Sequence, residues 1–487
     1  MLLEGRGYFW PAQDPIPSGR IGPRSAVPGH LTVEDDGTSR IALDDVLPLS
    51  KDHGTWLPFP SQAPVEAMIA GVLVGTDQRV LLDRLIHTGR SRKSLGPSQD
   101  FYTASHCLIA PKGFVLAPGM RFRWLELDLE PYSDWLGGHG IEVSVGRRSI
   151  TARYRRVEPI RWQIGSRVLE LVRSLDGRSD GRLHQISWRE QNLLRIGSRS
   201  PAMTASAAAS LTSQIEDLLT LLADCDSRLA FPTIRVSRRS SPVTLYYSRI
   251  PRAERHAEWH KAWASFGAIK PSFGRIMEAW LECYDRIGAG FYLYLGNRRG
   301  LKMYSEHRFA SLAWGMEALH RSIYPPTKND RLTKKVERII GNIELDKDKV
   351  WAEGKLRGVG EPSLGTRIST LVRALPIIIL PKEAAQFGDQ CAKLRNDISH
   401  FGGPRDTAGY DDFAERLSRF TAALEILYHA LLLQQGGLPT EFIRARFDGG
   451  LHSPAAAAVL ADCGLTVAGW KPKPATASTE GSYPRAV

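Results

Sequence analysis

The sequence predicts an α+β multidomain protein with an N-terminal β-sandwich or barrel-like domain, a helical connector and a C-terminal four-helix bundle. Two patterns predict this: short alternating apolar runs with Gly, Pro and Asp-Gly turns fill the chain to about residue 190, and apolar residues at helical spacing dominate from residue 259. The chain of 487 residues is also longer than one hydrophobic core ordinarily organises, so more than one domain is expected. We expect a β-rich domain at 1–250, a connector at 251–300, a helical domain at 301–445 and a disordered tail at 446–487.

The β-rich domain contains two hairpin patterns. In each, an apolar run leads through a polar turn into a second apolar run, as residues 31–33 do through Asp35-Asp36-Gly37 to 41–43, and 71–74 do through Thr76-Asp77 to 80–82. Further strands are expected at 122–129 and at the arginine-rich 141–154. Such strands pack as a sandwich or a distorted barrel.

Helical spacing begins with an apolar stripe at 211–222, which predicts a helix flanking the β-rich domain. Large apolar residues then recur at helical intervals up to Gly288. We interpret them as core rather than as a platform for stacked bases, because packing requires a stripe of this period. They are Trp259, Trp263, Phe266, Ile276, Trp280 and Tyr284.

Four helices are expected in the helical domain. The first begins near Lys302 and ends before Pro325-Pro326, and the second is a charged helix at 329–343. The third spans 382–400, and the fourth carries a continuous apolar seam from Phe413 to Leu431. Four helices of this kind form a bundle.

Composition excludes some classes of protein. No apolar stretch is long enough to span a bilayer and the N-terminus lacks a signal pattern, so a cytoplasmic location is expected. The five cysteines lack CxxC spacing and predict neither a disulfide framework nor a zinc knuckle. The formal net charge of +12 would attract a polyanion, but charge alone does not separate RNA binding from solubility.

The segment Arg395-Asn396-Asp397-Ile398-Ser399-His400 is the main candidate for catalysis. A histidine exchanges protons near neutral pH and an arginine stabilises phosphate charge, so the pair suits RNA cleavage by internal transfer. On a helix, Asn396 and His400 share a face, whereas Arg395 is rotated by about 140° from His400. A second copy of the helix from a twofold partner would complete the cleft.

Two weaker patterns give no site. His256 and His260 have the spacing of metal ligands, but Glu258 does not complete an HExxH pattern and no third ligand is evident. The segment 296–300 lacks the length and the lysine of a phosphate-binding loop, so a basic turn is expected. The sequence therefore predicts no metal and no cofactor.

The Arg395–His400 segment and three further regions carry a resemblance to a known family. Arg395 to His400 matches the Arg-x-x-x-x-His signature of the HEPN superfamily, including its frequent Asn after the Arg. The chain resembles more specifically the ApeA type of HEPN protein, a bacterial anti-phage family. The similar regions are Gly7-Tyr8-Phe9-Trp10 with Gly29-His30-Leu31, the aromatic segment 259–280, and the helix from Phe309 through Met316-Glu317-Ala318-Leu319-His320.

This resemblance implies a homodimeric, metal-independent ribonuclease that cuts RNA, with tRNA as the expected target, in an abortive response to phage. It implies catalytic roles for Arg395, Asn396 and His400, while Glu317 and His320 either support the site or form a surface pair at i and i+3. The β-rich domain would sense a phage-derived trigger. The alternative is a non-catalytic HEPN module that binds RNA or protein and has a ligand-sensing β-domain.

Overall fold

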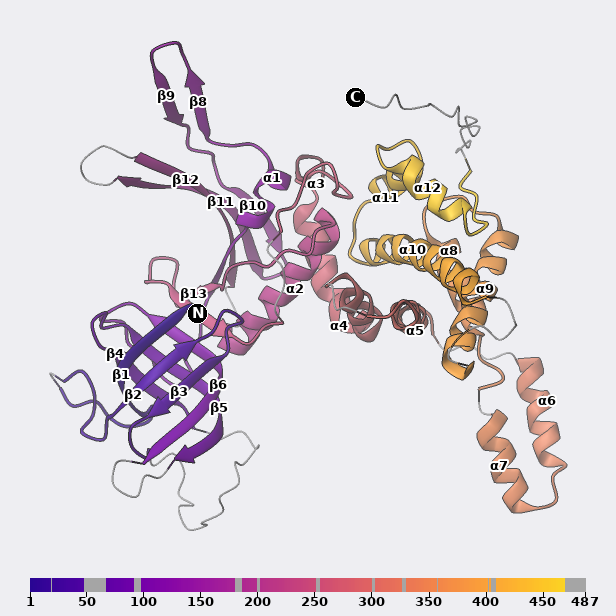
Figure 1. Cartoon of the computed structure of the whole chain (residues 1–487), viewed down its shortest axis with the longest axis horizontal. Helices are drawn as coiled ribbons and strands as arrows, with labels where there is room; N and C mark the ends of the chain where they lie inside the picture. Colours follow the sequence, from indigo (N-terminus) through magenta and orange to yellow (C-terminus); the bar gives the residue numbers. More distant parts are fainter. Residues whose placement is uncertain are drawn as a thin grey trace, which may run out of the picture. The chain divides into compact units, whose positions relative to one another are not determined.

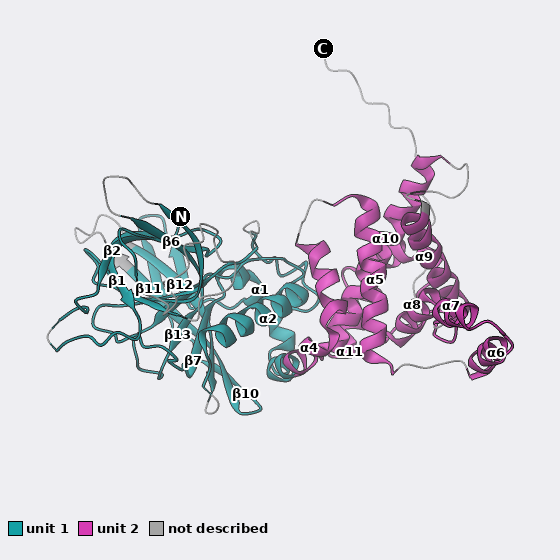
Figure 2. Cartoon of the chain, turned by 90° about the horizontal axis from the view of Figure 1, so that it is seen from below, with its two compact units in different colours: residues 1–278 teal, residues 279–487 magenta. Residues whose placement is uncertain are grey.

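The computed structural model divides into two compact units, residues 1–278 and 279–487 (Figures 1 and 2). It describes residues 1–18, 20–47, 67–91, 98–179, 186–198, 202–250, 255–299, 303–325, 330–356, 358–401, 403 and 409–468. The first unit is β-rich and the second is helical, which confirms the predicted α+β class. No helix within these ranges is long and apolar enough to cross a membrane.

A closed six-stranded antiparallel barrel opens the first unit (Figure 1). Its strands are β1 (Leu3–Pro11), β2 (Val27–Val33), β3 (Ser39–Leu43), β4 (Ile69–Leu73), β5 (Arg79–Ser91) and β6 (Gln99–Ala110). The order β1-β2-β3-β6-β5-β4 returns to β1, so each strand has two neighbours. Both predicted hairpins are confirmed, since β2 pairs with β3 and β4 pairs with β5.

Phe9 fills the interior of this barrel and is fully buried. A Cβ at Gly71 would lie 2.3 Å from the Phe9 ring, and a Cβ at Gly29 would lie 3.1 Å from it. Gly7 is paired with Gly29 across β1 and β2. Glycines on neighbouring strands therefore leave the space that this ring occupies, since protein interiors have no spare volume.

A second sheet continues from β6, whose residues 100–104 pair with β3 and whose residues 106–109 pair with β14. It contains β7 (Trp124–Asp128), β10 (Ile160–Ile164), β11 (Arg167–Ser179), β12 (Ile186–Ser198), β13 (Thr233–Arg235) and β14 (Val243–Tyr247). The strands β8 (Ile141–Val145) and β9 (Ile150–Tyr154), which flank Arg147 and Arg148, form a separate, largely exposed hairpin. The β-structure thus extends beyond residue 190.

The helices of the first unit flank these sheets. They are η1 (Glu130–Tyr132), α1 (Ser133–Leu136), α2 (Ala205–Ala223) and α3 (Phe266–Ile269), and α4 (Phe273–Arg298) continues into the second unit. α2 confirms the predicted flanking helix, and α4 kinks at Gly288, where φ is 32°. The predicted aromatic core is buried except at Trp259, which is 62% exposed because it precedes the helices in a turn.

The bundle of the second unit consists of α5 (Ser305–Ile323), α8 (Leu364–Ala374), α9 (Pro381–Phe401) and α10 (Tyr410–Gln435), which pack on one another. The charged helix expected as the second bundle member is α6 (Asp330–Gly341), and it buries no residue. α8 takes its place because Ile368, Leu371 and Val372 give it a buried stripe. α6 instead lies beside α7 (Asp346–Leu356) (Figure 1).

The prediction of a disordered tail from residue 446 is wrong for its first part. α11 (Thr440–Phe447) and α12 (Ser453–Ala461) are folded, and Leu460 and Leu465 are fully buried. The backbone N–H of Ala468 donates to the Ile378 carbonyl at 3.1 Å. The alanine-rich segment therefore forms a small packed helix, and the rest of the predicted tail, 469–487, lies outside the described residues.

Candidate active site

α9 carries the Arg-x-x-x-x-His segment and is fixed to the bundle by one apolar side. Ala384, Phe387, Cys391 and Leu394 are buried at helical intervals. The Phe387 ring stacks on Phe420 of α10 with centroids 5.4 Å apart and planes 11° apart. Burial also raises the pKa of the Cys391 thiol, which marks this side as dry core.

A close crossing with α8 fixes the position of α9 further. A Cβ at Gly388 would lie 2.2 Å from the Gly365 carbonyl oxygen, and a Cβ at Gly365 would lie 2.6 Å from the Asp389 carboxylate. Only glycine permits two helix backbones to approach so closely. The crossing lies seven residues before Arg395, about two helical turns along α9.

The three predicted catalytic residues lie in the last two turns of α9. At about 100° per residue, Asn396 and His400 are directed away from the buried Leu394, whereas Arg395 lies at the edge of the packed side. His400 is exposed, and Arg395 and Asn396 are half-buried. The imidazole therefore lies where a polymer can reach it.

Arg395 is half-buried, but its guanidinium is available to bind a ligand. Its Nε is buried and makes no hydrogen bond among the described residues. Such a group is costly to leave unsatisfied, and a phosphate oxygen would satisfy it with a charge-assisted bond. His400 occupies the last turn of α9, at the end of the helix where basic side chains interact favourably with the helix dipole. Both groups therefore suit an anionic ligand.

Glu317 and His320 belong to an ion-pair network at the end of α5. Glu317 accepts from Arg321 at 3.1 Å, and Arg321 and Arg367 both contact Glu361 at 2.8 Å. A guanidinium N–H of Arg367 lies 3.3 Å from Nδ1 of His320. Because arginine only donates, Nδ1 must accept and the imidazole is neutral.

Burial and the nearby Arg367 and Arg321 lower the pKa of His320. The residue is only 6% exposed, so it is not part of a surface pair. These contacts link the start of α8 to the end of α5. Arg367 and Glu361 were not predicted from the sequence, because a buried arginine interrupts the apolar pattern by which α8 would be recognised.

The weaker candidates do not form sites. Nε2 of His260 lies 3.1 Å from Glu258, and no group of three His, Cys, Asp or Glu side chains within the described ranges is arranged to hold a metal. The expected basic turn is instead helical, since Gly296 to Arg298 end α4, and Gly300 lies outside the described residues.

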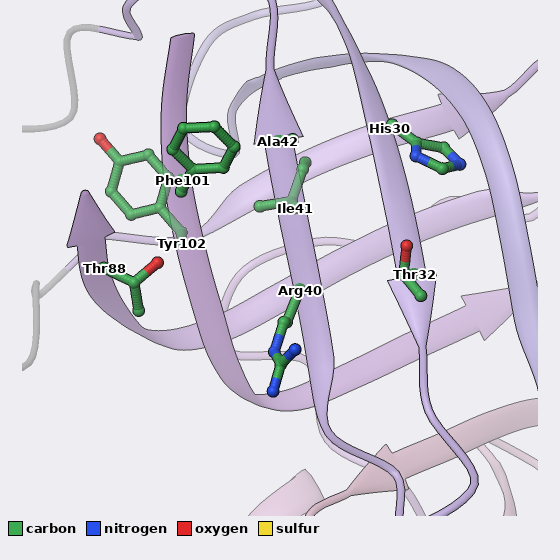
Figure 3. Close-up of a pocket in the computed structure, with 8 residues that line it drawn as sticks. All are labelled: His30, Thr32, Arg40, Ile41, Ala42, Thr88, Phe101 and Tyr102. Atoms are coloured by element: carbon green, nitrogen blue, oxygen red, sulfur yellow. The ribbon is translucent and has the colours of Figure 1, made fainter. Parts of the chain in front are cut away.

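A groove on the barrel is lined by His30, Thr32, Arg40, Ile41, Ala42, Thr88, Phe101 and Tyr102 (Figure 3). Its basic side chains already face carboxylates. His30 lies 3.2 Å from Glu4, and Arg40 lies 2.8 Å from Glu34. Both basic side chains therefore already have an acidic partner, and we assign the groove no role.

A packed helical bundle with Arg-x-x-x-x-His at the end of a core helix defines the HEPN class, whose members are generally ribonucleases and bind RNA. Residues 310–442 match the family model described as Apea-like HEPN, which includes α5 to α10 almost completely. This part of the chain is therefore an Apea-like HEPN domain, as predicted. No curated protein and no solved structure matches the chain.

Proposed function

We propose that the protein is a metal-independent RNA endonuclease that acts in anti-phage defence by abortive infection, with tRNA as its expected substrate. The observation that supports this most is the position of Arg395, Asn396 and His400 on an accessible end of α9 within an Apea-like HEPN domain. The two ionisable side chains are those that internal phosphoryl transfer requires.

In the proposed reaction, the ribose 2′-oxygen forms a bond to the adjacent phosphorus and the bond from phosphorus to the 5′-oxygen breaks. A histidine accepts the 2′-hydroxyl proton, and a protonated histidine donates a proton to the leaving 5′-oxygen. Arg395 stabilises the charge on the non-bridging oxygens, and Asn396 orients the imidazole or a phosphate oxygen. The products carry a 2′,3′-cyclic phosphate and a 5′-hydroxyl.

We propose that two copies of the chain form the cleft. One α9 supplies a single histidine, whereas the reaction needs one base and one acid at the same time. Asn396 and His400 are directed away from the core of their own bundle, so a second α9 related by a twofold axis can approach them. The homodimer then places two histidines and two arginines around one phosphate.

The β-rich unit would restrain the nuclease until a phage-derived trigger binds. Uncontrolled cleavage would kill the host cell, so the activity needs a control. The closed barrel and its attached sheet form a unit with its own core, as a separate sensor requires.

The central test of this function compares RNA cleavage by the full-length protein and by His400→Ala. We expect the substitution to abolish strand scission and toxicity, because no other group replaces the imidazole. Arg395→Ala should lower the rate by at least about a hundredfold through loss of charge stabilisation. A chelator should leave the rate unchanged.

Both variants should unfold like the unsubstituted protein, because His400 is exposed and Arg395 is half-buried. Undiminished scission by His400→Ala would refute the catalytic assignment. RNA binding without scission in either protein would favour the alternative, a non-catalytic RNA-binding module.

A further inference from the structure

α6 is an amphipathic helix whose two sides have different environments. Its apolar side carries Val336, Ile340 and the nearby Thr333, all half-buried. α6 lies beside α7, whose Ala352 is buried (Figure 1). Leu332 and Ile339 border this side and are 37% and 42% exposed. The apolar side is therefore the one that approaches α7.

The opposite side of α6 is basic. Arg331, Lys334, Lys335 and Arg338 follow the spacing i, i+3, i+4 and i+7, so they share one face of the helix. All four side chains are exposed. They extend over about 10 Å of helix, because each residue adds 1.5 Å. This basic face thus presents a short line of four positive charges.

These four cations have no partner among the residues that the structure describes. Several other exposed arginines of the same unit are paired, as Arg308 is with Glu425 at 2.5 Å and Arg321 with Glu361 at 2.8 Å. On the neighbouring α7, three lysines are matched in number by three acidic residues. α6 therefore gathers four unpaired positive charges on one face.

We propose that the basic face of α6 binds the phosphate backbone of the RNA substrate, and this inference rests on the proposed function. A line of unpaired cations on the nuclease unit matches a polyanion in charge, and neutralising phosphates releases counterions. A lipid surface fits less well, because a membrane-bound helix inserts its apolar side, and that side of α6 is directed at α7. The contact is to phosphate and is independent of base sequence.

Binding can be measured without cleavage in full-length His400→Ala, with unfractionated tRNA as the probe over a range of salt concentrations. Adding Lys334→Gln and Arg338→Gln should weaken binding by roughly tenfold and make the salt dependence shallower by about 1.4 to 2 in log–log slope. The matched control is Lys347→Gln with Lys355→Gln on α7, which removes the same charge from exposed positions of the neighbouring helix.

The control should bind tRNA within about twofold of the parent and keep its salt slope. Glutamine is a good helix former, so all variants should have the same melting temperature. Equal losses in both variants, or no loss in either, would overturn the inference, as would binding to anionic lipid vesicles in place of tRNA. If the α6 substitutions weaken binding but the protein that retains His400 cuts no RNA, only the proposed nuclease activity is refuted. If they leave binding unchanged and that protein does cut RNA, only the proposed role of α6 is refuted.

Discussion

Burial and the nearby Arg367 and Arg321 lower the pKa of His320, and only Glu317 opposes this shift. The His320 pKa is lowered in the folded protein, so between that value and about 6.5 the unfolded chain binds more protons. Stability is therefore lost as the pH falls below about 6.5. In His320→Gln, which still accepts a hydrogen bond from Arg367, the urea midpoint should depend less on pH in this range.

The matched control for this prediction is His307→Gln, an exposed histidine on the same helix α5. It should keep the pH dependence of the unsubstituted protein. If His320→Gln and the unsubstituted protein lose stability in parallel on acidification, the claim that His320 is neutral in the folded protein is refuted.

At the scale of the element, the crossing of α8 and α9 supports the candidate catalytic segment. Gly388→Ala should destabilise the protein by about 2 kcal/mol, since the new methyl would meet the Gly365 carbonyl at 2.2 Å and force the helices apart. RNA cleavage should fall as well, because α9 would shift. Denaturant unfolding together with the cleavage rate measures both effects.

Gly354→Ala is the control for Gly388→Ala, because nothing lies within 4 Å of a Cβ at this position of α7. It should stabilise the helix by up to about 1 kcal/mol and leave cleavage unchanged. Similar losses in both variants would show that the α8–α9 crossing is not tightly packed.

Some elements of the fold could be predicted from the sequence and others could not, for physical reasons. α10 was predictable because its apolar seam repeats every three or four residues, and the hairpins were predictable from their turns. α6 shows the same amphipathic signal as a bundle helix, so its exposure was not predictable. The pairing of β5 with β6 closes the barrel, and no local pattern in the sequence indicates this pairing. The candidate site was predicted as a segment, but the buried Arg367 network was not.

At the scale of the whole molecule, the proposed two-chain cleft predicts how mixed dimers behave. When unsubstituted and His400→Ala chains are mixed, a dimer formed from one of each retains a single histidine in the shared cleft. Because the reaction needs a base and an acid at the same time, this mixed dimer should be inactive. The rate should therefore fall with the square of the unsubstituted fraction, and the dependence of the rate on the mixing ratio measures this.

Two self-contained sites would give a different result, because the unsubstituted chain of a mixed dimer would keep its own complete site. A rate that falls only in proportion to the unsubstituted fraction, while mixed dimers form, would argue against the shared cleft. Dimerisation would then contribute to the stability of the protein and not to its active site.

The most direct measurement of the central claim is the chemistry of the cut RNA ends. Total RNA is incubated with the full-length protein, with and without chelator, and the termini are sequenced beside a His400→Ala reaction. Because the 2′-hydroxyl is the nucleophile, the proposed transfer predicts 2′,3′-cyclic phosphate and 5′-hydroxyl ends from the unsubstituted protein, with or without chelator. It predicts no new ends with His400→Ala. Ends with a 5′-phosphate, or cleavage of the equivalent DNA, would contradict it.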